Sequence, residues 1–256
     1  MQSFFRRIYL WIDESNLWGS QRLMEKLFSR RAHSYSFYGE DLLIRAIISR
    51  IKYETGIELQ LNYVDIGAWR PIRGSNTYTS YKLGSRGTVV EPNIAFRKHW
   101  RILRPEDQFL QFACGKMSEA QFLLFQSGSP ANTLDSNFAA KIGEKESRIL
   151  TESYMVKVMT LDEILEAHLN RFPGDYFLDI DVEGLDFEVI TSFDFKSKLR
   201  PIILLVEDTE PMILQSQIHE HLVKLKYALV ARTPISSCYL DFTRDEISGL
   251  NEISRI

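Results

Sequence analysis

Short apolar segments alternate along this chain with helical segments, and this alternation limits the fold more than any other feature. The predicted strands are residues 59–66, 87–91, 108–114, 121–126, 154–159, 175–181, 201–207, 227–232 and 236–242. Apolar residues at helical spacing or capping signals lie between several of them, over residues 40–51, 75–84, 161–170, 185–193 and 214–226. Strands that alternate with helices form a mostly parallel sheet covered on both faces. The sequence therefore predicts an open, doubly wound α/β sheet rather than a barrel.

The last two predicted strands are joined by only three residues, Thr233, Pro234 and Ile235. A connection this short favours a hairpin. We therefore expect the sheet to end with one antiparallel strand at its C-terminal side.

The size and composition of the chain favour one main domain with an appendage. We assign residues 1–33 to a helical extension, through which a homodimer could form, and residues 34–256 to the main domain. The net charge of −3 comes from acids and bases mixed along the chain, so no nucleic-acid partner is expected. No apolar run approaches the roughly 18 residues of a membrane span. Cys114 and Cys238 form neither a disulfide framework nor a metal-ligand spacing, which favours buried thiols in a cytoplasmic protein.

Four of the predicted inner strands end in carboxylates. These are Asp65, Glu91, Asp181 together with Glu183, and Glu207. Ligands of open α/β sheets bind beyond the carboxyl ends of the strands. A buried charge is costly without a partner, so four such strand ends indicate a ligand with hydroxyl groups or a positive charge.

The turn after the first of these strands excludes one common nucleotide ligand. Gly67 is followed by Ala68 and Trp69, without the G-x-G-x-x-G pattern that seats a pyrophosphate. The missing side chain of Gly67 would let a ligand approach the backbone. Glu91 stands where an acid accepts the hydroxyls of a ribose, although a capping role before the next helix is the alternative. A nucleoside with a cationic centre and no pyrophosphate describes S-adenosylmethionine.

An ordered set of motifs resembles the FkbM-type S-adenosylmethionine-dependent methyltransferases. The motifs are "SYSFYGEDLLI", "YVDIGAWRPIRGSNTY", "GSRGTVVEPN", "ANTL", "TLDEIL" and "FLDIDVEGLDFEVI", spread over about residues 34 to 240. The resemblance implies a Rossmann-like class I methyltransferase domain and S-adenosyl-L-methionine as cofactor. It also implies O-methylation of a hydroxyl group on a saccharide, a glycan or a related metabolite.

The resemblance further implies roles for the residues that match its motifs. Asp65, Gly67 and Ala68 would line the methionine end of the cofactor, and Glu91 would hold the ribose. The residues expected to bind the cofactor are Gly39, Glu40, Asp65, Gly67, Ala68, Ser75, Asn76, Thr77, Glu91, Pro92, Asn93 and Asp181. Asp41 would help Gly39 and Glu40 to close over the amino and carboxylate groups of the cofactor. The chain departs from the family pattern at Phe37, Trp69, Arg70 and Asp179.

Asp181 and Glu183 are the candidate catalytic residues. In a regular strand they would share one face with Asp179, and like charges held together raise a pKa. Asp181 could then serve as the general base for a hydroxyl acceptor. The alternative is that these acids only contact the cofactor or a bound cation. With Glu207 they offer hard oxygen ligands for a divalent metal, but no metal is expected.

Two other functions remain open from the sequence. A nicotinamide-dependent oxidoreductase would also use this type of fold, although the missing glycine-rich loop disfavours it. A non-catalytic interaction module that keeps the fold is the second alternative, and the departures at Trp69 and Arg70 would then be signs of drift.

Overall fold

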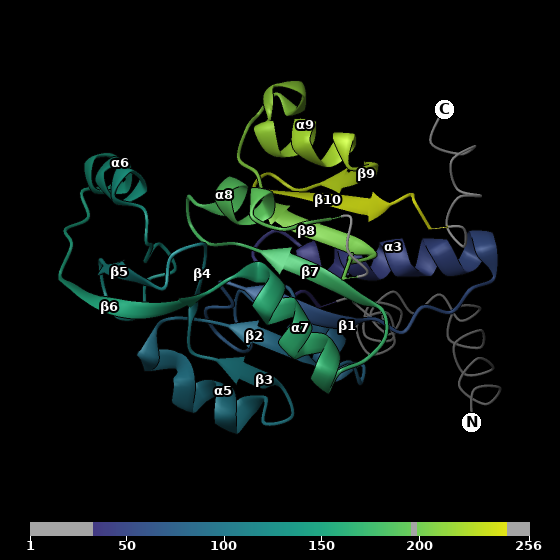
Figure 1. The fold of residues 1–256 in the computed structure, drawn as a ribbon, viewed down its shortest axis with the longest axis horizontal. Helices are drawn as coiled ribbons and strands as arrows, with labels where there is room; N and C mark the ends of the chain where they lie inside the picture. Colours follow the sequence, from purple (N-terminus) through teal and green to yellow (C-terminus); the bar gives the residue numbers. More distant parts are fainter. Residues whose placement is uncertain (1–32, 196–198, 245–256) are drawn as a thin grey trace, which may run out of the picture. The chain divides into compact units, whose positions relative to one another are not determined.

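The computed structural model describes residues 33–195 and 199–244 (Figure 1). The predicted extension lies, except for His33, outside the described residues, and so does any dimer contact that it would make. In the described ranges, no helix has both the length and the apolar character that crossing a membrane requires.

The centre of the fold is a seven-stranded sheet with the strand order β3-β2-β1-β7-β8-β10-β9. Its strands are β1 (Asn62–Ile66), β2 (Gly87–Val90), β3 (Gln108–Leu110), β7 (Tyr176–Ile180), β8 (Ile203–Glu207), β9 (Tyr227–Arg232) and β10 (Ser236–Asp241). The strands from β3 to β8 pair in parallel, and β10 runs antiparallel to both β8 and β9. The predicted C-terminal antiparallel strand is thus confirmed, but it lies inside the sheet and β9 forms the edge.

The register brings the ends of the inner strands to one edge of the sheet. Asp65 of β1 lies opposite Val89 of β2 on one side and Asp179 of β7 on the other. Strand β2 continues the sheet on one side of β1, whereas β7 and β8 continue it on the other. The strand order therefore reverses at β1, which is where a ligand binds in folds of this kind.

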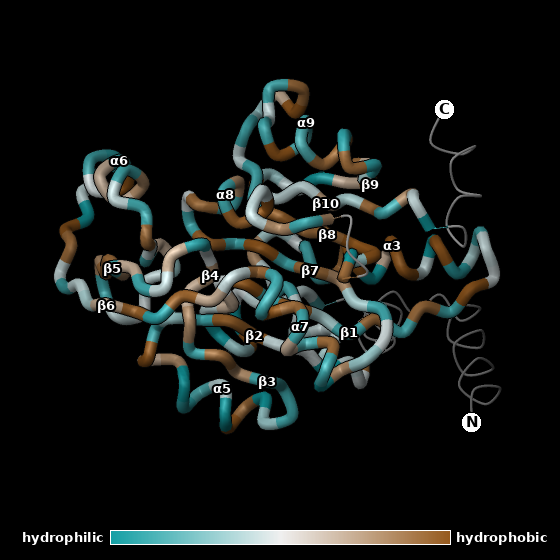
Figure 2. Tube along the Cα trace, viewed as in Figure 1, coloured by the Kyte–Doolittle hydropathy of each residue, from teal (hydrophilic) through white to brown (hydrophobic). Residues whose placement is uncertain are grey.

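Helices cover both faces of the sheet. They are α3 (Glu40–Thr55), α4 (Tyr78–Lys82), η1 (Ile94–Phe96), α5 (Arg97–Leu103), α6 (Ser136–Glu146), α7 (Leu161–Arg171), α8 (Asp186–Thr191), η2 (Ile213–Gln215) and α9 (Gln217–Lys224). Side chains alternate along β8, so that Leu204 packs in a core with α7, α8 and α9 while Leu205 packs in a second core with α3 and α5. Figure 2 shows mainly hydrophobic central strands, whereas α9 alternates between hydrophobic and hydrophilic residues.

Local signals explain where the helices begin and end. Thr160 and Glu163 form a capping box that starts α7. Gly56 follows the last residue of α3 with a left-handed φ of 74°, which a glycine adopts without strain. The predicted helices are confirmed as α3, α4, α7, α8 and α9, each within a few residues of its expected bounds.

A second, three-stranded sheet departs from the predicted single sheet. It consists of β4 (Ala113–Cys114), β5 (Glu119–Leu124) and β6 (Glu152–Met159) in the order β4-β6-β5, with β5 antiparallel to β6. The segment predicted as one strand over 108–114 is interrupted, so that β3 joins the large sheet and β4 joins the small one. Periodicity identifies a strand but not its pairing partner, which is why the sequence did not predict this sheet.

We expect the large sheet to depend on Leu178 in the middle of β7. Its side chain is fully buried, so Leu178→Ala should lower the free energy of unfolding by about 2–5 kcal/mol. The matched control is Leu214→Ala, because Leu214 is 85% exposed and its truncation should change stability by less than about 0.5 kcal/mol. Urea denaturation measures both variants, and equal losses would contradict the burial of β7.

Candidate active site

A cavity of about 200 Å³ lies at the carboxyl ends of the inner strands. Six carboxylates line it, those of Asp65, Glu91, Asp179, Asp181, Glu183 and Glu207. None of the described residues that line it is a lysine, an arginine or a histidine. The cavity therefore suits a ligand that brings positive charge or many hydroxyl groups.

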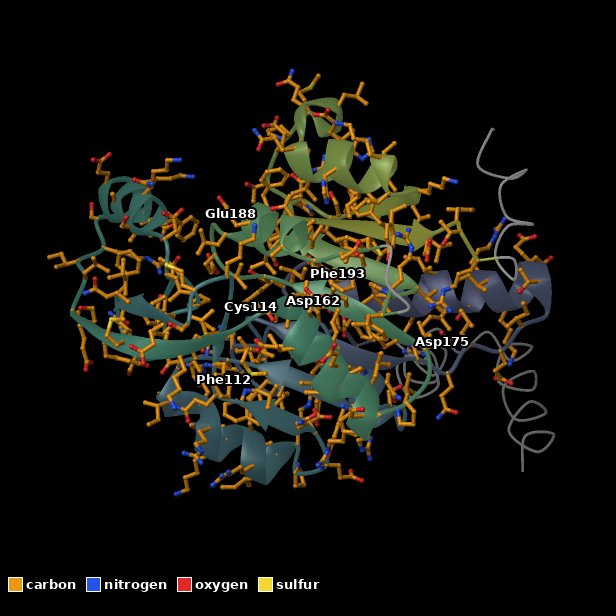
Figure 3. The ribbon with its side chains drawn as sticks, in the orientation of Figure 1. Phe112, Cys114, Asp162, Asp175, Glu188 and Phe193 are labelled. Atoms are coloured by element: carbon orange, nitrogen blue, oxygen red, sulfur yellow. The ribbon has the colours of Figure 1, made fainter. Side chains whose placement is uncertain are left out.

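Segments around the small sheet supply the opposite wall of this cavity. Phe112 and Cys114, labelled in Figure 3, lie where the chain passes from β3 into β4, and both line the cavity. The loop after β5 is held by two side chains from the strand ends: Asn93 Nδ2 donates to the carbonyl of Ser127 at 2.7 Å, and Trp69 Nε1 donates to that of Gly128 at 3.3 Å. The two sheets are thus joined directly at the cavity.

Most of the predicted site residues meet in this one place. The predicted residues that line the cavity are Asp65, Gly67, Ala68, Ser75, Asn76, Glu91, Pro92, Asn93, Asp181 and Glu183. Gly39, Glu40 and Thr77 are not among the lining residues. Glu40 accepts hydrogen bonds from the Thr233 hydroxyl and the Tyr38 N–H, at 2.8 and 2.9 Å, and Thr77 lies behind Asp65.

Asp41 does not line the cavity either, because its carboxylate is engaged elsewhere. It accepts hydrogen bonds from the hydroxyls of Ser34, Ser36 and Thr79 and from the backbone N–H of Tyr35. Burial alone would raise the pKa of Asp41, but these hydrogen bonds lower it below its usual value. Asp41 therefore fastens the segment before α3 to α4.

Two of the lining carboxylates accept hydrogen bonds from the loops around the cavity. Glu91 accepts from the N–H of Trp69 at 2.8 Å and from the N–H of Asn93 at 2.7 Å. Asp65 accepts from the Thr77 hydroxyl at 2.6 Å. The capping role that was the alternative for Glu91 belongs to Asn93, whose side chain accepts from the Ala95 N–H at 3.0 Å, while Glu91 holds the N–H of this cap residue. Each carboxylate oxygen has a further lone pair, so these hydrogen bonds leave room for a ribose hydroxyl.

Three other carboxylates face the cavity without a hydrogen bond to any side chain or backbone group in the described part of the chain. They belong to Asp181, Glu183 and Glu207. Burial, with the neighbouring acids in addition, raises the pKa of Asp181 to about 7, of Glu183 to about 9 and of Glu207 to about 10. These are the groups available for a ligand and for proton transfer.

Asp179, Asp181 and Glu183 do not lie on one regular strand, contrary to the expectation from alternation. Strand β7 ends at Ile180, and Glu183 has a left-handed φ of 58°. Trp69, which follows β1 and donates to Glu91 at the end of β2, has a left-handed φ of 43°. Non-glycine residues in this region are strained and tend to occur at functional sites. The three acids still line the same cavity because the turn after β7 folds over its edge.

Gly67 has a structural reason to be glycine that the sequence did not reveal. Its φ is +85°, and a Cβ atom there would lie 1.7 Å from the main-chain carbonyl oxygen of Asp181. The space beside Gly67 is therefore filled by the neighbouring strand end. Its contact with a cofactor stays a prediction.

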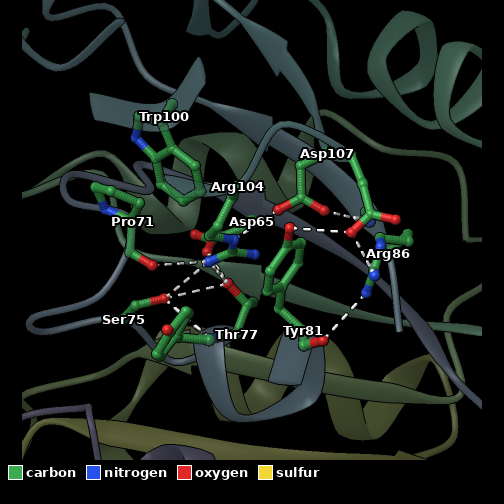
Figure 4. A network of polar contacts seen from close by, with 12 residues as sticks. Asp65, Pro71, Ser75, Thr77, Tyr81, Arg86, Trp100, Arg104 and Asp107 are labelled. Carbon is green, nitrogen blue, oxygen red and sulfur yellow. Dashed lines mark hydrogen bonds and ion pairs between the residues drawn. The ribbon is translucent and has the colours of Figure 1, made fainter. Parts of the chain in front are cut away.

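Several cavity residues were not predicted. Asn132 and Thr133 line the wall, and the Thr133 hydroxyl donates to the Glu183 carbonyl at 2.7 Å. Both belong to the motif "ANTL", which the resemblance had matched without assigning a role. Arg104, buried behind Asp65 and Thr77 (Figure 4), had no signal in the sequence because the side-chain hydrogen bonds it makes, except that to Asp107, go to residues distant along the chain.

No group of three or more His, Cys, Asp or Glu side chains among the residues that the structure describes is arranged to hold a metal ion.

The mostly parallel sheet with a cavity at its switch point defines a Rossmann-like α/β protein. Residues 65–229 match the family model of the methyltransferase FkbM domain, so the chain belongs to the FkbM methyltransferase family. No curated protein matches the chain significantly, and no solved structure does so either.

We expect the protein without ligand to lose stability as the pH rises from 6.5 to 9. The pKa values of Asp181, Glu183 and Glu207 are raised above unfolded values near 4. The folded state therefore binds more protons than the unfolded state in this range, and stability falls as those protons are lost. His168, whose pKa burial lowers to about 4, acts weakly in the opposite direction, because only its unfolded form still binds part of a proton at pH 6.5, and the three acids outweigh it. Thermal unfolding at both pH values measures the effect.

Glu207→Gln should raise the unfolding temperature at both pH values, and by several degrees more at pH 9, because the cost of keeping this carboxyl protonated in the folded state grows as the pH rises above its unfolded pKa. In a chain of this size, 1 kcal/mol corresponds to roughly 2–4 °C. Glu144→Gln, at an exposed position of α6, is the control and should have no effect at either pH. A lower unfolding temperature for Glu207→Gln at pH 9 would contradict an unpartnered carboxylate.

Proposed function

We propose that the protein is an S-adenosylmethionine-dependent O-methyltransferase with a class I, doubly wound fold. Its acceptor in this proposal is a hydroxyl group of a saccharide, a glycan or a related metabolite. The observation that carries the proposal is the cavity at the switch point of a methyltransferase-family domain, lined by six carboxylates and by no basic side chain of the described chain. A sulfonium and an ammonium group match that charge.

The lining residues fit such a cofactor in two regions. Glu91 stands at the end of β2 and retains lone pairs for the ribose hydroxyls, with Pro92 and Asn93 beside it for the adenine. Asp65 and Ala68, at the end of β1, suit the methionine part. The carboxylates attract the cationic end of the cofactor and exclude anions of similar size.

The cofactor supplies a methyl group that is already activated on its sulfonium sulfur. The protein's contribution is to position the acceptor oxygen toward this methyl group and to accept the proton of the acceptor hydroxyl. When the acceptor oxygen takes the methyl group, its hydroxyl proton would pass to Asp181. The raised pKa of Asp181, about 7, lets this carboxylate accept a proton at neutral pH. Glu183 and Glu207, with higher pKa values, hold their protons and can donate hydrogen bonds to the acceptor.

We expect the wild-type protein to bind S-adenosylmethionine and Glu91→Gln to bind it about 10–150-fold more weakly. A charged hydrogen bond is worth about 1.5–3 kcal/mol, and the amide keeps only one of the two acceptor oxygens. Isothermal calorimetry measures both. Glu166→Gln, at an exposed site of α7, is the control. If the wild type does not bind S-adenosylmethionine, the proposed function is wrong. Binding of NADH instead would favour the oxidoreductase.

Asp181→Asn should lower the rate of methyl transfer by about 10²–10⁴-fold and leave the affinity for the cofactor within about tenfold. The assay uses methyl-labelled cofactor with extracts of the source cell, followed by mass spectrometry of the labelled product. Equal labelling by the variant would rule out Asp181 as the base. Tight cofactor binding by the wild type without any labelled product would favour the non-catalytic module.

A further inference from the structure

Arg104 is a buried cation directly behind the cavity (Figure 4). It follows α5, is 1% exposed, and its Nε forms an ion pair with Asp107 Oδ2 at 2.6 Å. Its guanidinium carbon lies 4.6 Å from the ring centre of Trp100 and 5.1 Å from that of Tyr63. A buried cation is costly to keep, so its contacts indicate what it is needed for.

The contacts of Arg104 Nη1 all lie in the loop that lines the cavity. Nη1 donates to the Thr77 hydroxyl at 3.0 Å, the Ser75 hydroxyl at 3.2 Å and the Pro71 carbonyl at 3.3 Å. The Thr77 hydroxyl in turn donates to Asp65 Oδ2 at 2.6 Å. One hydroxyl group thus connects the guanidinium to the carboxylate at the end of β1.

The charges that face Asp65 are otherwise negative. Glu91 lies on the side of β2, Asp179 and Asp181 lie on the side of β7, and Asp107 lies behind with Arg104. Burial raises the pKa of Asp65 to about 6, while the hydrogen bond from Thr77 and the charge of Arg104 lower it. Among the described groups that act on Asp65, Arg104 is the one cation.

We propose that Arg104 is a positioning residue of the methyl-donor site. It holds the loop from Pro71 to Thr77 against the cavity and, through the Thr77 hydroxyl, keeps the Asp65 carboxylate oriented and ionised. This role rests on the proposed function, because Asp65 is the acid that meets the cationic end of the cofactor there. An ionised Asp65 attracts that end, whereas a protonated one does not.

The test separates the effect of charge on Asp65 from a loss of structure. The variants are Arg104→Met, Arg104→Lys as the conservative rescue, and Thr77→Val, which removes only the connecting hydroxyl. The control is Arg86→Met, because Arg86 also stacks on an aromatic ring and pairs with an acid, but with the exposed Glu106. Carboxyl ¹³C NMR follows the titration of Asp65 without ligand, with Asp65→Asn for assignment. Calorimetry measures S-adenosylmethionine affinity from pH 5.5 to 8.5.

We expect Arg104→Met to move the Asp65 titration up by at least one pH unit and to weaken cofactor binding at pH 7 by at least tenfold. Much of that affinity should return at pH 8.5, where Asp65 ionises again. Thr77→Val should shift the Asp65 titration and the cofactor affinity at pH 7 in the same direction as Arg104→Met. Arg104→Lys should shift these two quantities less, and Arg86→Met should change neither of them.

A loss of affinity that is equal at every pH, with an unchanged Asp65 titration, would reduce Arg104 to a packing role. If Arg104→Met does not fold, Arg104→Lys and Thr77→Val decide the question by the same two measurements. If the wild type does not bind S-adenosylmethionine, the proposed function fails, and the NMR titration alone still decides whether Arg104 controls the ionisation of Asp65.

Discussion

Carboxylates at the ends of adjacent buried strands are the constraint on which the rest of the structure depends. A parallel sheet brings these ends together, and a buried charge without a partner is costly. The fold compensates the cost of burying these charges in different ways for different acids. Backbone N–H groups satisfy Glu91, and a hydroxyl backed by a guanidinium satisfies Asp65. Asp181 and Glu207 have no such partner in the described chain, and burial raises their pKa to about 7 and about 10.

This division separates the acids that build the cavity from those that can act in it. Burial outweighs the two backbone hydrogen bonds of Glu91 and raises its pKa to about 8, so these bonds fix the position of the carboxylate rather than its charge. Of the acids without partners, Glu183 and Glu207 keep their protons near neutral pH, whereas Asp181, with a pKa of about 7, can accept or release one there. A cationic ligand would favour the ionised form of these groups, and any ligand that binds only the folded state stabilises it. The energetic cost of the site in the free protein is therefore relieved when the site is filled.

Much of this site could be predicted from the sequence because its main residues follow the ends of strands. Alternating strands and helices imply a parallel sheet, and the carboxyl ends of parallel strands share an edge, which is how Asp65, Glu91 and Asp181 were grouped. Features that depend on long-range pairing could not be predicted. Nothing local shows that β4 leaves the large sheet, or that Arg104 reaches Ser75, 29 residues away. The turn at Glu183 breaks the alternation that the prediction assumed.

Of the departures from the family pattern, Trp69 lines the cavity and Arg70 lies against the Trp69 ring. The Trp69 N–H donates to Glu91, and its indole donates to Gly128 in the loop of the small sheet. Arg70 stacks 4.7 Å from the Trp69 ring centre, and Phe37, which is 56% exposed, lies against the same indole at 5.8 Å. Here one aromatic side chain connects the predicted ribose acid, the loop opposite and an exposed ring at the cavity, so these residues do not argue against catalysis.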